Sequence, residues 1–340
     1  ASLRHLTIET PIHNTQAVFI ASNIQHLHYL NLCLSPKEFT QIEAKNFGDG
    51  IASGSLNELC LTLPATDKRE EIIVTGERSR SVIRSCPSFT IDELAEALAR
   101  HKNTSLQKLV LHQGYFQNKQ ATSLAQIIRH TVIQELQLGT NEDETDHESD
   151  QFIGNRGLSD LMDALAQNDT LTSFSFCCDK ATESGFKLIA EAVEKNTTIK
   201  SLAVGTYLTI KREATFIAFA IAFLKNETLT SFNLDNCVEN YPIPIHLADM
   251  IESQLELNKK IEGISSPTDS ITYYNQLLQF RNEKQKVFDD YINSHAKSFL
   301  RHNYLSSERL RLLGNTQQLG APANEIETTD ALDKSPVFET

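Results

Sequence analysis

The residues best suited by type to nucleophilic chemistry are Cys60 and His112, which fall in two neighbouring segments of one repeating apolar pattern. A thiol nucleophile needs a base within hydrogen-bond reach and donors that stabilise an oxyanion. The flat sheet that these segments predict offers no such donors, and the chain has no GxxxxGK phosphate loop, HExxH helix or GxSxG elbow. We therefore expect a protein that is not an enzyme, with no catalytic residue and no cofactor.

Metal sites find equally little support. The run NEDETDHESD at 141–150 has six carboxylates, but it lacks the spacing of a calcium-binding EF-hand. An isolated acidic run of this kind is typical of a solvated loop. Six cysteines are scattered without a CxxC pair, at Cys33, Cys60, Cys86, Cys177, Cys178 and Cys237. This pattern favours reduced thiols over a zinc site or a disulfide framework.

Four Asn-x-Ser/Thr sequences have the form of glycosylation acceptors, at Asn103, Asn168, Asn196 and Asn226. Each asparagine stands three residues before the first apolar residue of a predicted strand and directly follows a predicted helix. Helices often end on a left-handed residue, a conformation that Asn tolerates better than most residues. We therefore interpret the four motifs as helix terminators that adopt this conformation.

The elements that position all these residues are repeats of an LxxLxL segment. It recurs eight times with apolar substitutions, beginning at Leu3, Leu27, Leu56, Leu106, Ile133, Leu171, Ile199 and Leu229, in steps of 24, 29, 50, 27, 38, 28 and 30 residues. Between these segments, apolar residues at helical spacing predict helices around 91–98, 124–128, 158–165, 186–193 and 216–224. The fold class is therefore an α/β solenoid, a horseshoe or arc with a concave parallel sheet and convex helices.

The segments ALARHKNTSLQKLVL (97–111) and AFLKNETLTSFNLDNC (222–237) resemble the ribonuclease-inhibitor-like class of leucine-rich repeats. Together with the bias toward Asn, Gln, Lys and Ile, the degenerate array is similar to the type IV secreted leucine-rich-repeat effectors of Legionella. This resemblance implies a virulence effector that is cytoplasmic in the bacterium and is then translocated into the host cell. It also implies a eukaryotic host protein as the partner.

Two long steps and the end of the periodicity divide the chain. We expect a leucine-rich-repeat array of about eight repeats over 1–258, with insertions near 64–89 and 140–151. The first insertion is basic and includes apolar Ile72–Val74 and Val82–Ile83, which predict a hairpin, while the second is acidic. A helical cap is expected over 259–313 and a disordered tail over 314–340.

Alternate strand residues face the concave surface of such a sheet. The residues expected to bind a protein partner there are His5, Tyr29, Asn31, Glu58, Lys108, His112, Glu135, Gln137, Ser175, Ser201, Asn233 and Asp235. The alternative is a GTPase-binding or GTPase-activating protein that uses an exposed Arg or Asn loop, which the basic insertion could supply. Binding of a protein partner on the concave face is the leading expectation, because nothing in the basic insertion identifies such a loop.

Composition limits the partners further. A net charge of −13 argues against nucleic acid and anionic membranes, because phosphate binding needs concentrated Lys and Arg. No apolar run approaches the roughly 20 residues that span a bilayer, and the sequence does not start with the pattern of a classical signal peptide. An acidic protein that stays monomeric is the expectation.

Overall fold

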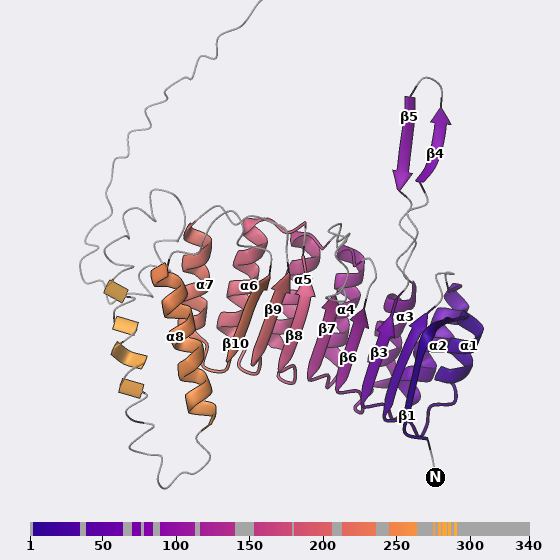
Figure 1. Cartoon of the computed structure of the whole chain (residues 1–340), viewed down its shortest axis with the longest axis horizontal. Coiled ribbons are helices and arrows are strands. Elements are labelled where there is room, and N and C mark those ends of the chain that lie inside the picture. The colour runs from indigo at the N-terminus through magenta and orange to yellow at the C-terminus, as the bar shows by residue number, and fades with distance from the viewer. Residues whose placement is uncertain are drawn as a thin grey trace, which may run out of the picture. The chain divides into compact units, whose positions relative to one another are not determined.

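Eight parallel strands form one open sheet in the computed structural model, in the order β1-β2-β3-β6-β7-β8-β9-β10 (Figure 1). The structure describes residues 3–34, 39–63, 70–75, 78–83, 89–112, 116–139, 153–178, 180–205, 213–235, 245–263 and scattered residues between 275 and 290. The sheet strands are β1 (His5–Ile12), β2 (Tyr29–Leu34), β3 (Glu58–Thr62), β6 (Lys108–His112), β7 (Glu135–Gly139), β8 (Ser173–Cys177), β9 (Ser201–Gly205) and β10 (Ser231–Asp235). Each LxxLxL segment therefore forms one strand, as predicted.

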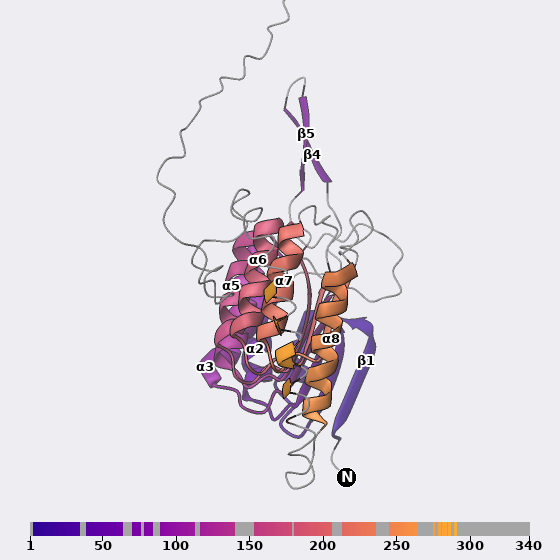
Figure 2. The same ribbon diagram turned by 90° about the vertical axis from the view of Figure 1, so that its left-hand side faces the viewer.

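Helices alternate with these strands and, except for the last helix, which lies at the β10 end, cover one face of the sheet (Figures 1 and 2). They are α1 (Asn14–Ala21), α2 (Gln41–Ser53), α3 (Phe89–His101), α4 (Asn118–His130), α5 (Asn155–Gln167), α6 (Glu183–Lys195), α7 (Glu213–Lys225) and α8 (Ile245–Glu262). Each helix packs against the next along the array. This arrangement is a leucine-rich-repeat-like α/β solenoid, which confirms the predicted fold class.

The core lies between the two layers and explains the leucine pattern. In β2, Leu30 and Leu32 are fully buried, while Tyr29, Asn31 and Cys33, which alternate with the leucines, are half-buried on the other face. Because side chains alternate across a strand, the last two leucines of each motif point toward the helices. Leu3 occupies the first leucine position of its motif but remains 62% exposed, because β1 is the edge strand of the sheet.

Glycines bring some of the helices into close approach. A Cβ atom at Gly157 of α5 would lie 2.8 Å from the Cα of Asn118 at the start of α4. A Cβ atom at Gly50 of α2 would lie 2.7 Å from the carbonyl carbon of Ala21 in α1. Real Cβ atoms do not approach other atoms so closely, so larger residues at these positions would force the helices apart.

The four asparagines of the Asn-x-Ser/Thr motifs form a ladder that ties each repeat to the one before it. The Asn196 Nδ2 donates to the carbonyl oxygens of Leu165 (2.7 Å) and Asn168 (2.9 Å) in the preceding repeat. Its Oδ1 accepts from the backbone N–H groups of Thr198 (2.9 Å) and Ile199 (2.7 Å).

The other asparagines repeat this geometry. Asn103, Asn168 and Asn226 donate backward to the carbonyls of Ala52, Ile128 and Val193, at 2.8, 2.6 and 2.8 Å. Asn258 of α8 adds a further rung, because its Nδ2 donates to the carbonyls of Asn226 and Leu229. The hydroxyl two residues after each motif asparagine also donates across to the preceding repeat, as Thr198 does to the Asn168 carbonyl.

The predicted left-handed conformation of these asparagines is wrong. Asn168 and Asn196 have φ of −82° and −77° with ψ of 139° and 138°, which is extended backbone. Among the described non-glycine residues, a positive φ occurs at Lys102 alone, which precedes Asn103. Asn is needed at these positions because its side chain donates and accepts hydrogen bonds at the same time, and not because it tolerates a left-handed backbone. Since Asn196 and Asn226 are only 2% exposed, neither can serve as a glycosylation acceptor in the folded protein.

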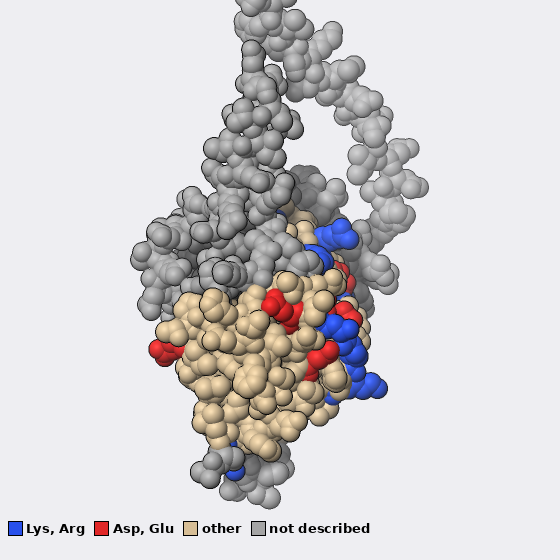
Figure 3. All heavy atoms as spheres, turned by 90° about the vertical axis from the view of Figure 1, so that its right-hand side faces the viewer, with Lys and Arg blue, Asp and Glu red and all other residues tan. Residues whose placement is uncertain are grey.

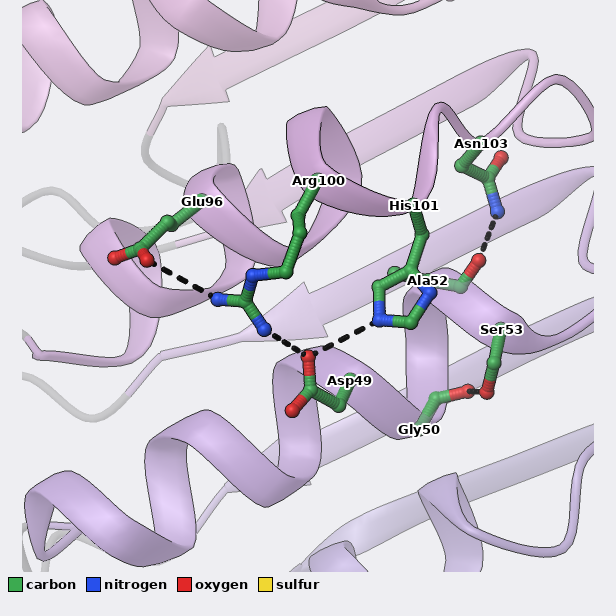
Figure 4. Close-up of polar contacts among 8 residues, drawn as sticks. All are labelled: Asp49, Gly50, Ala52, Ser53, Glu96, Arg100, His101 and Asn103. Carbon is green, nitrogen blue, oxygen red and sulfur yellow. Dashed lines mark hydrogen bonds and ion pairs between the residues drawn. The ribbon is translucent and has the colours of Figure 1, made fainter.

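On the convex side, charged residues join neighbouring helices next to the first rung of the ladder (Figure 4). The Asp49 carboxylate of α2 accepts from Arg100 (2.7 Å) and lies 3.2 Å from the His101 ring nitrogen, both on α3. These side chains are about one-third or more exposed, so the pairs contribute little to stability.

The chain divides into two compact units, residues 1–281 and 282–340. The first holds the sheet and α1–α8, and the scattered described residues of the second unit are helical. The predicted boundary at 258 falls inside α8, and the helical cap remains a prediction. The predicted tail at 314–340 and the acidic insertion at 140–151 lie outside the described residues.

Candidate binding face

The strand register brings the sequence-predicted face residues into columns that run across the sheet. The first column, in strand order, is His5, Tyr29, Glu58, Lys108, Glu135, Ser173, Ser201 and Ser231. The second is Thr7, Asn31, Cys60, Val110, Gln137, Ser175, Ala203 and Asn233. In the third, Cys33, Thr62, His112 and Gly139 align in one stretch and Cys177, Gly205 and Asp235 in another. All twelve predicted residues thus share these columns, and their role in binding stays a prediction.

Three neighbouring strands carry a row of alternating charge, which we call the charged row: Glu58, Lys108 and Glu135. The Lys108 Nζ lies 3.4 Å from a Glu58 carboxylate oxygen and 3.3 Å from one of Glu135. Burial lowers the pKa of Lys108, but hydrogen bonds to Glu135 and Glu58 and their negative charges outweigh it, so its pKa is raised. Lys108 therefore carries its charge at neutral pH, and the side chains of all three residues remain partly exposed.

Beside the charged row, an aromatic pair occupies the first two strands. The rings of His5 and Tyr29 stack with their centroids 5.8 Å apart and their planes at 26°. Tyr29 is half-buried and His5 is exposed. Stacked rings of this kind are rigid and amphipathic, which suits them to anchor a bound protein.

The C-terminal part of the face is lined by small side chains. Ser173, Ser175, Ser201 and Ala203 occupy the first two columns on β8 and β9, and all four are half-buried. Gly205 stands in the third column, where a Cβ would lie 2.6 Å from the Cys177 sulfur. A partner helix or loop can approach the backbone of this region closely, because few atoms project from it.

Cys60 and His112 do not form an activated pair. Cys60 lies opposite Val110 in the register and His112 lies opposite Thr62, two residues further along. Burial raises the pKa of the Cys60 thiol and the charge of Glu58 raises it further, while burial lowers the pKa of His112. A raised thiol pKa reduces the thiolate population that a nucleophile needs. Cys60 is 7% exposed and Val110 is 6% exposed, so these two middle-column residues are more buried than the alternation predicts.

Other predicted features of the site are only partly described. The basic insertion contains the predicted hairpin, formed by antiparallel β4 (Glu70–Thr75) and β5 (Arg78–Ile83). Of its basic residues, Arg78 and Arg80 lie on β5, while Lys68, Arg69 and Arg84 lie outside the described residues. Within the described ranges, no three His, Cys, Asp or Glu side chains gather as metal ligands would. Nor does any helix in this part of the chain have the length and apolar character needed to cross a bilayer.

Sequence reasoning found the residues of the face but missed how they pair. The alternating charge was visible in the sequence, because the third positions of three successive LxxLxL motifs are Glu58, Lys108 and Glu135. Opposite charges directly across neighbouring strands stabilise a sheet. The insertion between Glu58 and Lys108 obscured this adjacency, because it separates the two residues by 50 positions in the chain.

Comparison with known proteins leaves the function open. No family model matches the chain, and no curated protein matches it. Among solved structures, one titled "Leiomodin-1 Actin-Binding Site 2 (ABS2)" is 13% identical, with a TM-score of 0.37, and the match covers 73% of this chain and 99% of that one. A Caenorhabditis elegans tropomodulin C-terminal domain is 7% identical, with a TM-score of 0.30 and coverage of 73% and 93%. At these values, neither match identifies a partner for this chain.

Proposed function

We propose that this protein is a non-enzymatic interaction scaffold that binds a protein partner on the concave face of its sheet. The observation that supports this most strongly is the charged row beside the His5–Tyr29 stack, on the sheet face opposite the helices. Aromatic anchors supply binding energy, and partly exposed charges supply orientation and selectivity. A rigid sheet holds both in place before the partner arrives, which lowers the entropic cost of binding.

The two ends of the face would make different contacts with the partner. The partner would meet aromatic and charged side chains over β1, β2, β3, β6 and β7. Over β8 and β9, the small side chains of Ser175, Ser201 and Ala203 leave room for a helix or loop to lie close to the backbone. A partner with a segment of complementary alternating charge would be selected over one with a uniform charge.

Reversing the whole charged row tests this proposal without breaking its ion pairs. The triple variant Glu58→Lys/Lys108→Glu/Glu135→Lys keeps opposite charges at the positions now 3.4 and 3.3 Å apart but inverts the sign of each. Its folding should therefore be close to that of the native protein, as judged by circular dichroism. Affinity capture from a eukaryotic cell lysate should recover a specific partner with the native chain and lose it with the triple variant.

The matched control is Lys45→Glu on α2, an exposed charge reversal on the helical side. This variant should recover the partner as well as the native chain does. Equal recovery by the native chain and the triple variant would contradict the concave-face proposal.

We further propose that the partner belongs to a eukaryotic host, with the protein acting as a translocated bacterial effector. The support is the resemblance of the repeats and of the residue bias to secreted effectors, described above. The GTPase-activating alternative is an outcome of the same capture: a recovered GTPase whose hydrolysis rate rises with added protein would favour it. A recovered partner that is not a GTPase would favour the scaffold.

A further inference from the structure

Among the described residues, no strand lies beside the outer edge of β1, and this edge can accept another strand. The Tyr29 N–H donates to the Arg4 carbonyl, so the outward groups of β1 in the regular stretch are those of His5 and Thr7. Within the described residues, β1 has a neighbour on one side only, at β2. Pro11 lies further along, where the pairing with β2 is irregular between Ile8 and Ile12, and it has no N–H to donate to either side.

An apolar hollow of about 370 Å³ adjoins this open edge, lined by Ile8, Ile12, Thr15, Gln16, Phe19 and Ile20. None of these residues is charged, and α1 contains no charged residue at all. Phe19 is 69% exposed, an unusual state for so large an apolar side chain. Figure 3 shows that this end of the array has few charged side chains over its centre.

The sequence of β1 is complementary to itself when read backward, which indicates what covers this end. In an antiparallel pairing of two β1 strands centred on Thr7, His5 of one copy would lie opposite Glu9 of the other. Leu6 would lie opposite Ile8, and both are only half-buried in the single chain. The outward groups of Thr7 would face those of its own counterpart, and such a pair exchanges two hydrogen bonds.

We infer that this end binds a second copy of the chain through antiparallel pairing of the two β1 strands. A two-fold axis perpendicular to the sheet, midway between the two Thr7 residues, keeps the helices of both copies on the same side. The exposed Phe19 of each copy then lies over the hollow of the other, as expected of an interface that uses one patch twice. This inference departs from the expectation of a monomer that the composition gave.

Charge favours this end over the rest of the surface. Two copies that each carry −13 repel one another wherever acidic faces meet. Contact at the end lined by Phe19 and Ile20 avoids this repulsion, and each His5 would face the Glu9 carboxylate of the other copy. The inferred interface leaves the charged row uncovered in both copies, although it engages His5 of the His5–Tyr29 stack.

Sedimentation velocity of the full chain tests the inference. We expect a concentration-dependent species at twice the 38.1 kDa of one chain. Thr7→Pro removes an outward N–H that β1 does not use within its own chain, and Phe19→Asp places a charge over the hollow. Each should raise the dimer dissociation constant at least about tenfold. Ile42→Asp is the control, since Ile42 is 73% exposed but lies outside the hollow, and it should leave the constant unchanged.

Disulfide trapping fixes the register. Residues that form a hydrogen-bonded antiparallel pair have Cα atoms about 5.5 Å apart, within the range that a disulfide spans. Thr7→Cys alone should therefore cross-link to itself on mild oxidation. His5→Cys and Glu9→Cys should cross-link when mixed but not when oxidised separately. A native chain that remains monomeric at every concentration would overturn the inference, and so would dimers that Thr7→Pro and Phe19→Asp leave unchanged.

Discussion

Removing one rung of the asparagine ladder should destabilise the array far more than a typical surface substitution. Asn196→Ala deletes four hydrogen bonds, two to the carbonyls of Leu165 and Asn168 and two from the N–H groups of Thr198 and Ile199. At about 1 kcal/mol net for each bond, the free energy of unfolding should fall by about 4 kcal/mol. Domains are typically stable by only about 5–15 kcal/mol, so this is a large share.

The assay is urea unfolding followed by circular dichroism, with Asn57→Ala as the control. Asn57 is an exposed asparagine whose side chain has no hydrogen bond among the described residues, and its substitution should change stability by less than about 0.5 kcal/mol. A fall of less than about 1 kcal/mol for Asn196→Ala would refute the ladder as a source of stability.

A second substitution at the same position separates the donor role from the acceptor role. Asn196→Asp keeps an acceptor for Thr198 and Ile199 but turns an oxygen toward the two carbonyls, so it should destabilise at pH 7. Burial there raises the folded-state pKa of the introduced carboxyl above its unfolded value. The folded state then binds the proton more tightly, so the stability of the variant relative to the native chain should rise as the pH falls through the folded pKa. Urea unfolding of both proteins at a series of pH values measures this difference, and a difference that stays constant or widens toward low pH would contradict the assignment.

Three more predictions follow from single contacts. A Gly-to-Ala change usually stabilises a helix, but Gly50→Ala should lower the free energy of unfolding by about 1–3 kcal/mol, because its Cβ would meet the Ala21 backbone. Urea unfolding measures this, and a rise in the free energy of unfolding would contradict the close packing. Cys60 should react with iodoacetamide at about pH 8 more slowly in the native chain than in the unfolded chain, because burial raises the pKa of its thiol. Mass spectrometry measures the rate of alkylation, and faster alkylation of the native chain would support an activated Cys60–His112 pair. Burial holds the pKa of His112 below 6.5, so the native chain should lose stability relative to His112→Gln as the pH falls below about 6.5. If the difference in the free energy of unfolding between the two proteins does not vary with pH, this prediction is contradicted.

The sequence predicted the strands because their signal is local and strong. Leucines at alternate positions must face one layer, and eight repetitions of the motif determine the register as well as the strands. The hairpin at β4 and β5 was predictable for the same reason. Helices α1 and α2 were not, because their buried faces include small residues such as Ala17, Ala44 and Gly48, which give a weak periodic signal.

The roles of single residues were harder to predict than the elements. The conformational preference of Asn suggested a left-handed turn, whereas the real partners of Asn196 are carbonyls about 30 residues earlier in the chain. Such bonds exist only after repeats stack, so no local rule identifies them. The burial of Cys60 likewise depends on side chains from neighbouring strands, which the alternation within one strand does not reveal.

The most direct test of the concave-face account is site-specific photo-crosslinking to the captured partner. A photoreactive residue at Gln137, an exposed position on β7, should cross-link the partner in good yield. The same residue at Ile42, exposed on α2 on the helical side, should not. Cross-links from Ile42 with none from Gln137 would contradict the account and move the binding surface to the helices.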